Sequence, residues 1–431
     1  MSLIRGIRRW DLVALIINNI IGAGIFGLPS KVFALAGTYS IFSLLACAVV
    51  VSLIIFCFAE VSSRFTETGG PYLYAREAFG PIIGFEIGWL AWVSRLTSFA
   101  TICNLFVAYL SYILHEAQTE TWRASIIVCV VVALTTINLL GVRQSAVVTN
   151  IFTVGKLLPL LLFVGAGLFF LDTRQFSFAT PPSAGAFSTA AMLWMFSFFG
   201  FEAATIVAGE VAHPRRDFPF AMFVAMGIVS LLYISIQAVC IGTLPELASS
   251  ERPLADASDR FLGSAGTSVI LIGALLSMAG SLNVVLLTCT RLPFALAEQG
   301  QLPNIVAQTN ERFHTPHIAI LLSAAFTLFF TLSTTFMFAI TISTITRMLT
   351  YGVTCAALIK FRRTKGEAAF EIPAGIVVAI ASLALIVWLV SNSTGREALD
   401  VTIVATVGLV LYFSFSERSP SDRRMARQAP R

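Results

Sequence analysis

The chain contains 431 residues, of which 57% are hydrophobic and only 12% are charged, and its mean hydropathy is +0.85. A soluble domain of this length has no core large enough to bury so many apolar side chains, so the composition excludes a water-soluble globular protein. The formal net charge of +5 comes from basic residues that are spread along the chain, which argues against a nucleic-acid-binding protein.

Hydrophobic stretches recur at about the 20-residue length that an α-helix needs to cross roughly 30 Å of hydrocarbon. We predict an all-α polytopic membrane protein with about twelve transmembrane helices. No cleaved signal peptide is expected, because Arg5, Arg8 and Arg9 lead directly into the first long stretch. The predicted spans are 12–36, 39–59, 82–114, 124–140, 146–171, 187–209, 218–243, 265–296, 317–334, 337–360, 374–391 and 398–415.

The basic residues predict the orientation of the chain in the membrane. Most of the 28 Lys and Arg fall on the side that both termini share, for example Arg64, Arg76 and Arg362. By the positive-inside rule both termini are cytoplasmic, in a plasma membrane or a bacterial inner membrane. Residues 1–415 form a single transmembrane domain, and 416–431 form a basic cytoplasmic tail. All seven Cys fall inside predicted spans, so no disulfide framework is expected.

Two predicted spans contain interruptions. The first span carries IIGAGIFG at 20–27, in which Gly22, Ala23 and Gly24 favour an unwound turn, although glycines there could also serve close helix packing. The sixth span carries FSFFGFE around Gly200. Paired interruptions at corresponding places in two halves are typical of an inverted-repeat transporter with its binding site near the middle of the membrane.

Exposed helix ends predict which chemical groups such a site recognises. Backbone amides at the start of a half-helix bind a carboxylate, and carbonyl groups at the end of a half-helix accept an ammonium group. An α-amino acid carries both groups. We expect the amides of Ala23 and Gly24 to bind the carboxylate, and the ammonium to lie at the carbonyl groups of Ile20, Ile21, Phe196 and Phe199.

Four ionisable residues fall deep in predicted spans: Arg95, Lys156, Glu202 and Arg347. A charge at the centre of a bilayer costs a few kcal/mol unless it is paired or hydrated, so these side chains should face a cavity or one another. Glu202 and the two arginines could position helices through a salt bridge or act as a gate. Lys156 could carry a coupled proton, or it could remain protonated and hold the unwound carbonyl groups of the first span.

Four segments in the same order resemble the amino acid-polyamine-organocation superfamily over nearly the whole chain. They are GAGIF in the first span, FAEVSSRFTETGGPYLYAREAFG (58–80), FFGFEAATIVAGEVAHPRRDFP (198–219) and ALAEQGQLP (295–303). The resemblance implies the leucine-transporter fold, in which two inverted five-helix repeats precede two further helices. Here the repeats would cover about 10–172 and 185–362, and the last two helices about 374–415.

The resemblance also implies roles for individual residues. Phe196 occupies the place of the aromatic side chain that closes over the substrate, and we assign Glu202 to the same gate. Lys156 matches the lysine whose ammonium replaces the second sodium ion of sodium-coupled relatives, so sodium dependence is disfavoured. Ser277 and Ser281 could complete that site by bonding the lysine, or could bond their own helix backbone. Ala23 departs from the serine of many relatives.

The resemblance bears on partners as well. The loop 115–122 lacks the cysteine by which animal relatives attach a heavy chain, so no disulfide-linked subunit is expected. The predicted partners are the amino acid, the lipid bilayer and, in one alternative, protons. No cofactor or metal is expected, and the oligomeric state is left open.

The buried charges restrict the substrate. Arg95 and Arg347 outnumber Glu202, which makes cationic amino acids and polyamines electrostatically expensive. Neutral L-amino acids fit best, and an acidic substrate paired to either arginine stays open. Proton symport and amino acid exchange are equally compatible with this site. The chain lacks HExxH and GxSxG motifs, so we expect no enzyme, whereas a transport-inactive amino acid sensor of the same fold stays an alternative.

Overall fold

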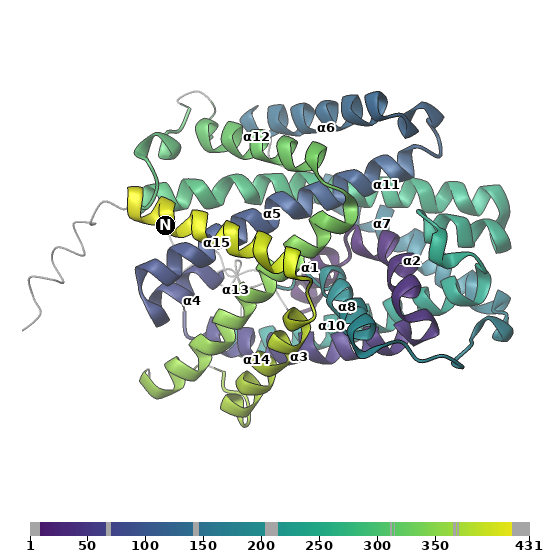
Figure 1. The fold of residues 1–431 in the computed structure, drawn as a ribbon, viewed down its shortest axis with the longest axis horizontal. Helices are drawn as coiled ribbons and strands as arrows, with labels where there is room; N and C mark the ends of the chain where they lie inside the picture. The colour runs from purple at the N-terminus through teal and green to yellow at the C-terminus, as the bar shows by residue number, and fades with distance from the viewer. Residues whose placement is uncertain are drawn as a thin grey trace, which may run out of the picture.

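The computed structural model describes residues 9–65, 70–140, 146–202, 214–310, 313, 315–364, 368 and 370–415, and every regular element in these ranges is a helix (Figure 1). The α-helices are α1 (Arg9–Ile20), α2 (Gly24–Ala36), α3 (Ser40–Ser63), α4 (Gly70–Phe79), α5 (Pro81–Leu110), α6 (Glu120–Leu140), α7 (Ala146–Gly167), α8 (Ala184–Ser197), α10 (Pro214–Thr243), α11 (Pro253–Glu298), α12 (His317–Ser333), α13 (Phe336–Thr364), α14 (Gly375–Ser391) and α15 (Gly395–Phe415).

The lengths of the helices fit a polytopic membrane protein. Seven helical stretches of the described chain are long and apolar enough to cross a membrane, and one of them, Gly24–Ser63, contains both α2 and α3. Four further apolar helices are shorter, with 10–17 residues. The all-α membrane class is therefore confirmed, while the number of twelve crossings stays a prediction.

The sequence missed two features of the helices. The loop between the second and third predicted spans contains a helix of its own, α4. In addition, α11 is two helices joined at a kink, where Gly263 has φ +62°. The predicted span 265–296 begins just after that kink, so it corresponds to the second part of α11.

The interruptions in the first and sixth predicted spans are real breaks in the helices. α1 ends at Ile20 and α2 begins at Gly24, so the residues between them belong to neither helix. α8 ends at Ser197, and the chain then turns through Gly200, whose φ is +115°. A positive φ of this size favours glycine.

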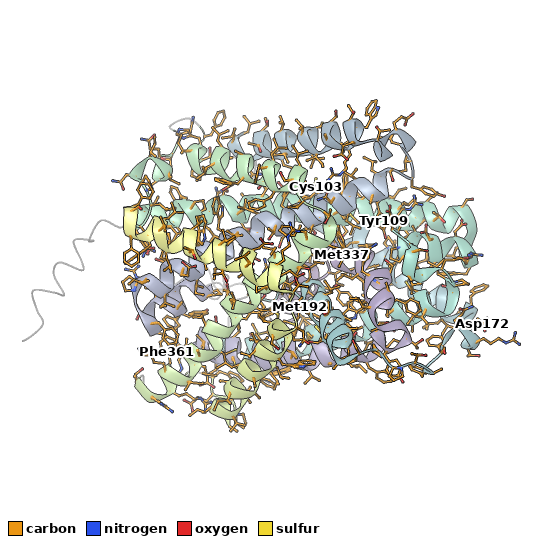
Figure 2. The ribbon with its side chains drawn as sticks, in the orientation of Figure 1. Cys103, Tyr109, Asp172, Met192, Met337 and Phe361 are labelled. Atoms are coloured by element: carbon orange, nitrogen blue, oxygen red, sulfur yellow. The ribbon has the colours of Figure 1, made fainter. Side chains whose placement is uncertain are left out.

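The helices pack in two groups (Figure 1). In the first group α1 packs on α10, α2 on α8, and α3 on both α8 and α10. In the second group α5 packs on α11 and α12, and α6 packs on α12. α13 lies against α5 and α3, so it contacts both groups. The hydroxyl of Tyr109, labelled in Figure 2, links the groups by donating to the carbonyl oxygen of Phe26 at 2.7 Å.

A buried ionic cluster joins the end of α3 to α13 and to the chain before α14. The Glu60 side chain has no exposed surface and accepts two hydrogen bonds from Arg362, at 2.7 and 2.6 Å. Glu60 also accepts from the backbone amide of Ile372 at 3.0 Å and from Arg64 at 3.1 Å. Because several donors surround this carboxylate, the cluster satisfies a charge that would otherwise be costly to bury.

Candidate functional site

The two helix breaks touch each other. A β-carbon on Gly24, at the start of α2, would lie 2.6 Å from the Ser197 hydroxyl oxygen and 3.0 Å from the Ser197 α-carbon at the end of α8. A β-carbon on Gly200 would overlap with the carbonyl oxygen of Asn19 in α1. Only glycine permits both approaches, so the two interruptions form one structural unit.

A cavity of about 140 Å³ lies beside this unit. It is bounded by both breaks and by one face each of α5 and α11. Most of the predicted site residues line it: Ile20, Gly22, Ala23, Gly24, Arg95, Phe196, Phe199, Gly200, Glu202, Ser281 and Arg347. Ile21, Lys156 and Ser277 do not. A cavity of this size has room for a compact organic molecule.

The helix ends at the cavity carry opposite partial charges. α2 has 13 residues and begins at Gly24, so its first amide groups have no partner within their own helix. α8 ends at Ser197, and Phe196 in its last turn lines the same cavity. The Tyr233 hydroxyl lies 3.1 Å from the carbonyl oxygen of Ser197 and 3.3 Å from that of Ile20, so its single proton can serve either break.

Two aromatic rings cover one side of the cavity. Phe196 and Phe199 are largely buried, and their ring centroids lie 5.7 Å apart in an edge-to-face arrangement. The guanidinium carbon of Arg347 lies 4.5 Å from the centre of the Phe199 ring. The aromatic wall is therefore continuous with the charged residues of the site.

Glu202 and Arg347 form an ion pair at the inner end of this wall. Arg347 Nη1 lies 3.1 Å from Glu202 Oε1, and both side chains are nearly buried, at 12% and 11% exposure. Glu202 Oε2 accepts from the Tyr351 hydroxyl at 2.8 Å and from the Gly200 amide at 3.0 Å. The pair thus connects the broken end of α8 to α13.

A second cavity of about 110 Å³ lies on the other side of this pair. Gly70, Pro71 and Tyr72 of α4 line its far wall. Three residues line both cavities: Arg95, Glu202 and Arg347. No other residue of the described chain does so. The charged side chains therefore form the partition between the two spaces.

Lys156 lies on α7 and does not face the cavity. Its ammonium donates to the carbonyl oxygen of Asn18 at 2.8 Å and to that of Ile21 at 3.1 Å. Both acceptors lie at the end of α1, where the break begins. This geometry matches the interpretation in which the lysine holds the unwound carbonyl groups, and it leaves the Ile21 carbonyl already engaged by a cation.

The two serines of α11 behave differently from each other. Ser281 lines the cavity, and its hydroxyl donates to the carbonyl oxygen of Ser277, 2.8 Å away in its own helix. The Ser277 hydroxyl is buried and has no hydrogen-bond partner within the described residues. Neither hydroxyl bonds the Lys156 ammonium in this part of the chain, so their predicted contact with it stays a prediction.

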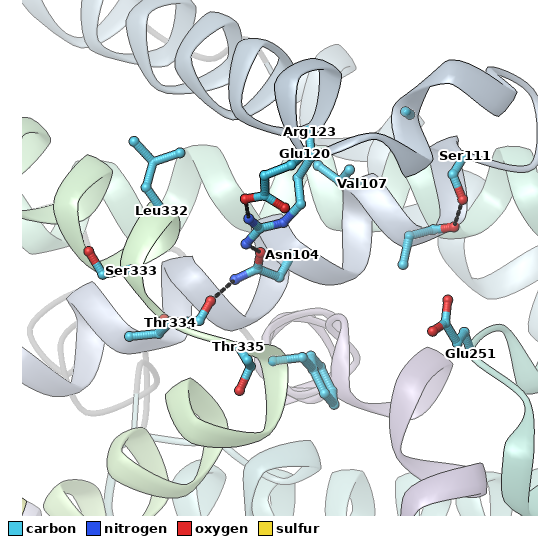
Figure 3. A pocket seen from close by; sticks show the side chains of 13 residues that line it. Asn104, Val107, Ser111, Glu120, Arg123, Glu251, Leu332, Ser333, Thr334 and Thr335 are labelled. Carbon is cyan, nitrogen blue, oxygen red and sulfur yellow. Dashed lines mark hydrogen bonds and ion pairs between the residues drawn. The ribbon is translucent and has the colours of Figure 1, made fainter.

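A larger pocket of about 710 Å³ lies at the end of α5 remote from α4 (Figure 3). Asn104, Arg123 and Glu251 line it, and Arg123 Nη2 donates to Asn104 Oδ1 at 2.7 Å. None of the predicted site residues reaches it. Phe336 lines this pocket and also lies within contact distance of Gly27, one helical turn beyond the break.

Comparison with known proteins decides the family. The family model for amino acid permeases matches residues 7–413, which is nearly the whole chain. The chain belongs to the amino acid permease family. Its members are transporters and not enzymes, and the chain is accordingly an integral membrane protein for amino acid transport.

Three relatives illustrate the range of this permease family. The chain is 28% identical to the b(0,+)-type amino acid transporter 1 of Mus musculus, over 94% of this chain and 86% of the relative. It is 26% identical to the methylthioribose transporter of Bacillus subtilis (strain 168), over 97% and 94%. It is 25% identical to the branched-chain amino acid permease BcaP of the same organism, also over 97% and 94%.

Several polar groups of this permease site were missed by sequence reasoning. Ser94, Ser98 and Thr288 contact or flank the buried arginines. Tyr233 bonds carbonyl oxygens at the two breaks, and Tyr351 bonds the Glu202 carboxylate. Hydroxyl groups in apolar helices usually bond their own backbone, so their residue type alone carries no signal. Only the spacing could have pointed to Thr288 as a site residue, since it lies seven residues, or two helical turns, after Ser281.

Proposed function

We propose that this permease is a secondary active transporter of small L-amino acids whose side chains carry no positive charge, that is, of neutral or acidic amino acids. The observation that carries the proposal is the contact between the breaks at Gly24 and Ser197 beside one cavity. The start of α2 offers amide groups to the substrate carboxylate, and the end of α8 offers carbonyl groups to its ammonium.

Alternating access would occur by movement of one helix group against the other. The contacts of α1 with α10 and of α3 with α8 join the same pairs of positions in two five-helix repeats, which supports the inverted repeat. In the same way, the packing of α5 on α12 corresponds to that of α11 on α6. The group of α1, α2, α3, α8 and α10 would rock on the group of α5, α6, α11 and α12.

The gate would have two parts. Phe196 closes over the substrate at the aromatic wall, and the pair of Glu202 and Arg347 separates the substrate cavity from the second cavity. With both termini cytoplasmic, the second cavity lies on the cytoplasmic side. Opening toward the cytoplasm would then require this nearly buried ion pair to separate.

Transport would be independent of sodium, because the Lys156 ammonium already supplies a cation to the carbonyl groups of the first break. The energy source would be a proton gradient or exchange for an internal amino acid. Uptake of a panel of radiolabelled amino acids into proteoliposomes tests the proposal. Uptake that saturates and does not need sodium supports it, and binding without uptake under any gradient would identify a sensor instead.

A further inference from the structure

Arg95 differs from the other buried charges of the site in its partners. Glu202 and Arg347 pair with each other, and Lys156 bonds two carbonyl oxygens. The Arg95 guanidinium donates one hydrogen bond, from Nη1 to the Thr288 hydroxyl at 2.9 Å. Its Nε is buried without a partner, and among the described residues no carboxylate lies within ion-pair distance of Arg95.

The position of Arg95 places this charge at the far end of the substrate cavity. On α11 the cavity wall runs from Ser281, whose hydroxyl faces Gly22 at the break, to Thr288, which bonds Arg95. Seven residues of α-helix span about 10 Å at 1.5 Å per residue. The Arg95 guanidinium therefore lies at the Thr288 end of the cavity wall.

The net charge of this end favours an anion. Two arginines, Arg95 and Arg347, and one carboxylate, Glu202, line the cavity, so these described residues carry a net charge of +1 there. A guanidinium has five donors in a planar fork that matches a carboxylate, and the described residues accept from one of the Arg95 donors. A charged group in this setting is expected to be paired when the site is filled.

We propose that Arg95 is a side-chain anion subsite and that acidic amino acids, L-aspartate or L-glutamate, are substrates of this cavity. The inference rests on the proposed function, because it assumes that the helix breaks hold the α-carboxylate and the ammonium. The second carboxylate of the substrate then lies at the Arg95 fork, with the Thr288 hydroxyl holding the guanidinium in place.

The test compares two nearly isosteric substrates, L-aspartate and L-asparagine, by kcat/KM for uptake into proteoliposomes. We expect the wild type to favour aspartate at least tenfold, which corresponds to about 1.4 kcal/mol. Arg95→Gln should lower this ratio at least tenfold, and Arg95→Lys should retain part of it because the charge remains. The control is the same substitution at an arginine outside the site, Arg252→Gln, since Arg252 is 24% exposed and lines none of these cavities. It should leave the ratio unchanged.

A second measurement, the melting temperature with and without ligand, distinguishes loss of the subsite from misfolding of the variant. L-aspartate should raise the melting temperature of the purified wild type more than L-asparagine does, and this difference should vanish in Arg95→Gln. Uptake of neutral amino acids that aspartate and glutamate do not inhibit would overturn the subsite and leave the transporter proposal standing. An unchanged ratio in a folded Arg95→Gln protein would also overturn the subsite. Absence of uptake of every amino acid would overturn the proposed function itself.

Discussion

Gly24 and Ser197 lie in direct contact, so that a β-carbon on the glycine would come within 2.6 Å of the serine hydroxyl oxygen. The two residues are far apart in the sequence and belong to different helices, one at its beginning and one at its end. Their contact brings a positive helix start and a negative helix end to the same cavity wall. This arrangement is complementary to the two charged groups of an amino acid.

A larger side chain at position 24, in place of Gly24, should therefore disrupt substrate binding. We expect Gly24→Ala to lower kcat/KM for uptake by about 100-fold, because a displacement of the order of 1 Å at a positioning group has that effect. Gly24→Val should abolish uptake. The matched control is Gly227→Ala in α10, where a β-carbon would meet nothing within 4 Å. Normal uptake by Gly24→Val would show that the substrate binds elsewhere.

Lys156 is the residue to test for proton coupling, because its ammonium bonds the carbonyl groups of the first break. If uptake by the wild type is stimulated by an inward proton gradient, Lys156→Met should lose that stimulation, because no titratable group then bonds the carbonyl oxygens of Asn18 and Ile21. The measurement is uptake with and without an imposed pH difference. Lys360→Met serves as the control, since this exposed lysine lies over the Phe79 ring. A gradient response that survives in Lys156→Met would leave the lysine a purely structural role.

The pair of Glu202 and Arg347 should show strong energetic coupling. Removing one partner of a nearly buried ion pair leaves the other uncompensated, at a cost of about 3–5 kcal/mol. We expect Glu202→Gln and Arg347→Gln each to lower the melting temperature of the purified protein, and the double variant to lose less than the sum. A double-mutant cycle checks this prediction. If the two losses in melting temperature were simply additive, Glu202 and Arg347 would not be coupled, and the pair would not stabilise the partition between the two cavities.

Glu60 should be needed for stability more than for binding. Glu60→Gln removes the charge that Arg362 and Arg64 surround, so we expect a loss of about 3–5 kcal/mol in stability. The control is Glu246→Gln, because the pair of Glu246 and Arg260 is 68% and 55% exposed and such pairs contribute about 0–1 kcal/mol. Thermal unfolding in detergent compares the two variants. Equal melting temperatures would contradict the importance of the buried cluster.

Much of the fold was predictable because a membrane imposes simple rules on a sequence. Long apolar stretches must be helices, and the glycines of the first and sixth spans interrupt them. The structure confirms the break before Gly24 and the turn at Gly200. In the structure Arg95, Glu202 and Arg347 line one cavity, an arrangement that fits the cost of burying a charge in lipid.

The partners within the site were not predictable, because they depend on how helices rotate against each other. The sequence left open whether Lys156 carries a coupled proton or holds the unwound carbonyl groups of the first span, and packing places its ammonium on the carbonyl oxygens of Asn18 and Ile21. It likewise gave no reason to choose Thr288 or Tyr351 among the many hydroxyl groups of the helices. The prediction of substrate-binding carbonyl groups included Ile21, which lies outside the cavity lining.

The measurement that tests the central claim most directly is uptake of radiolabelled amino acids into proteoliposomes, with and without unlabelled amino acid inside and with and without an inward proton gradient. The account predicts saturable, sodium-independent uptake that Gly24→Val abolishes and Gly227→Ala retains. Saturable binding with no uptake under any of these conditions, or equal uptake by Gly24→Val, would contradict it.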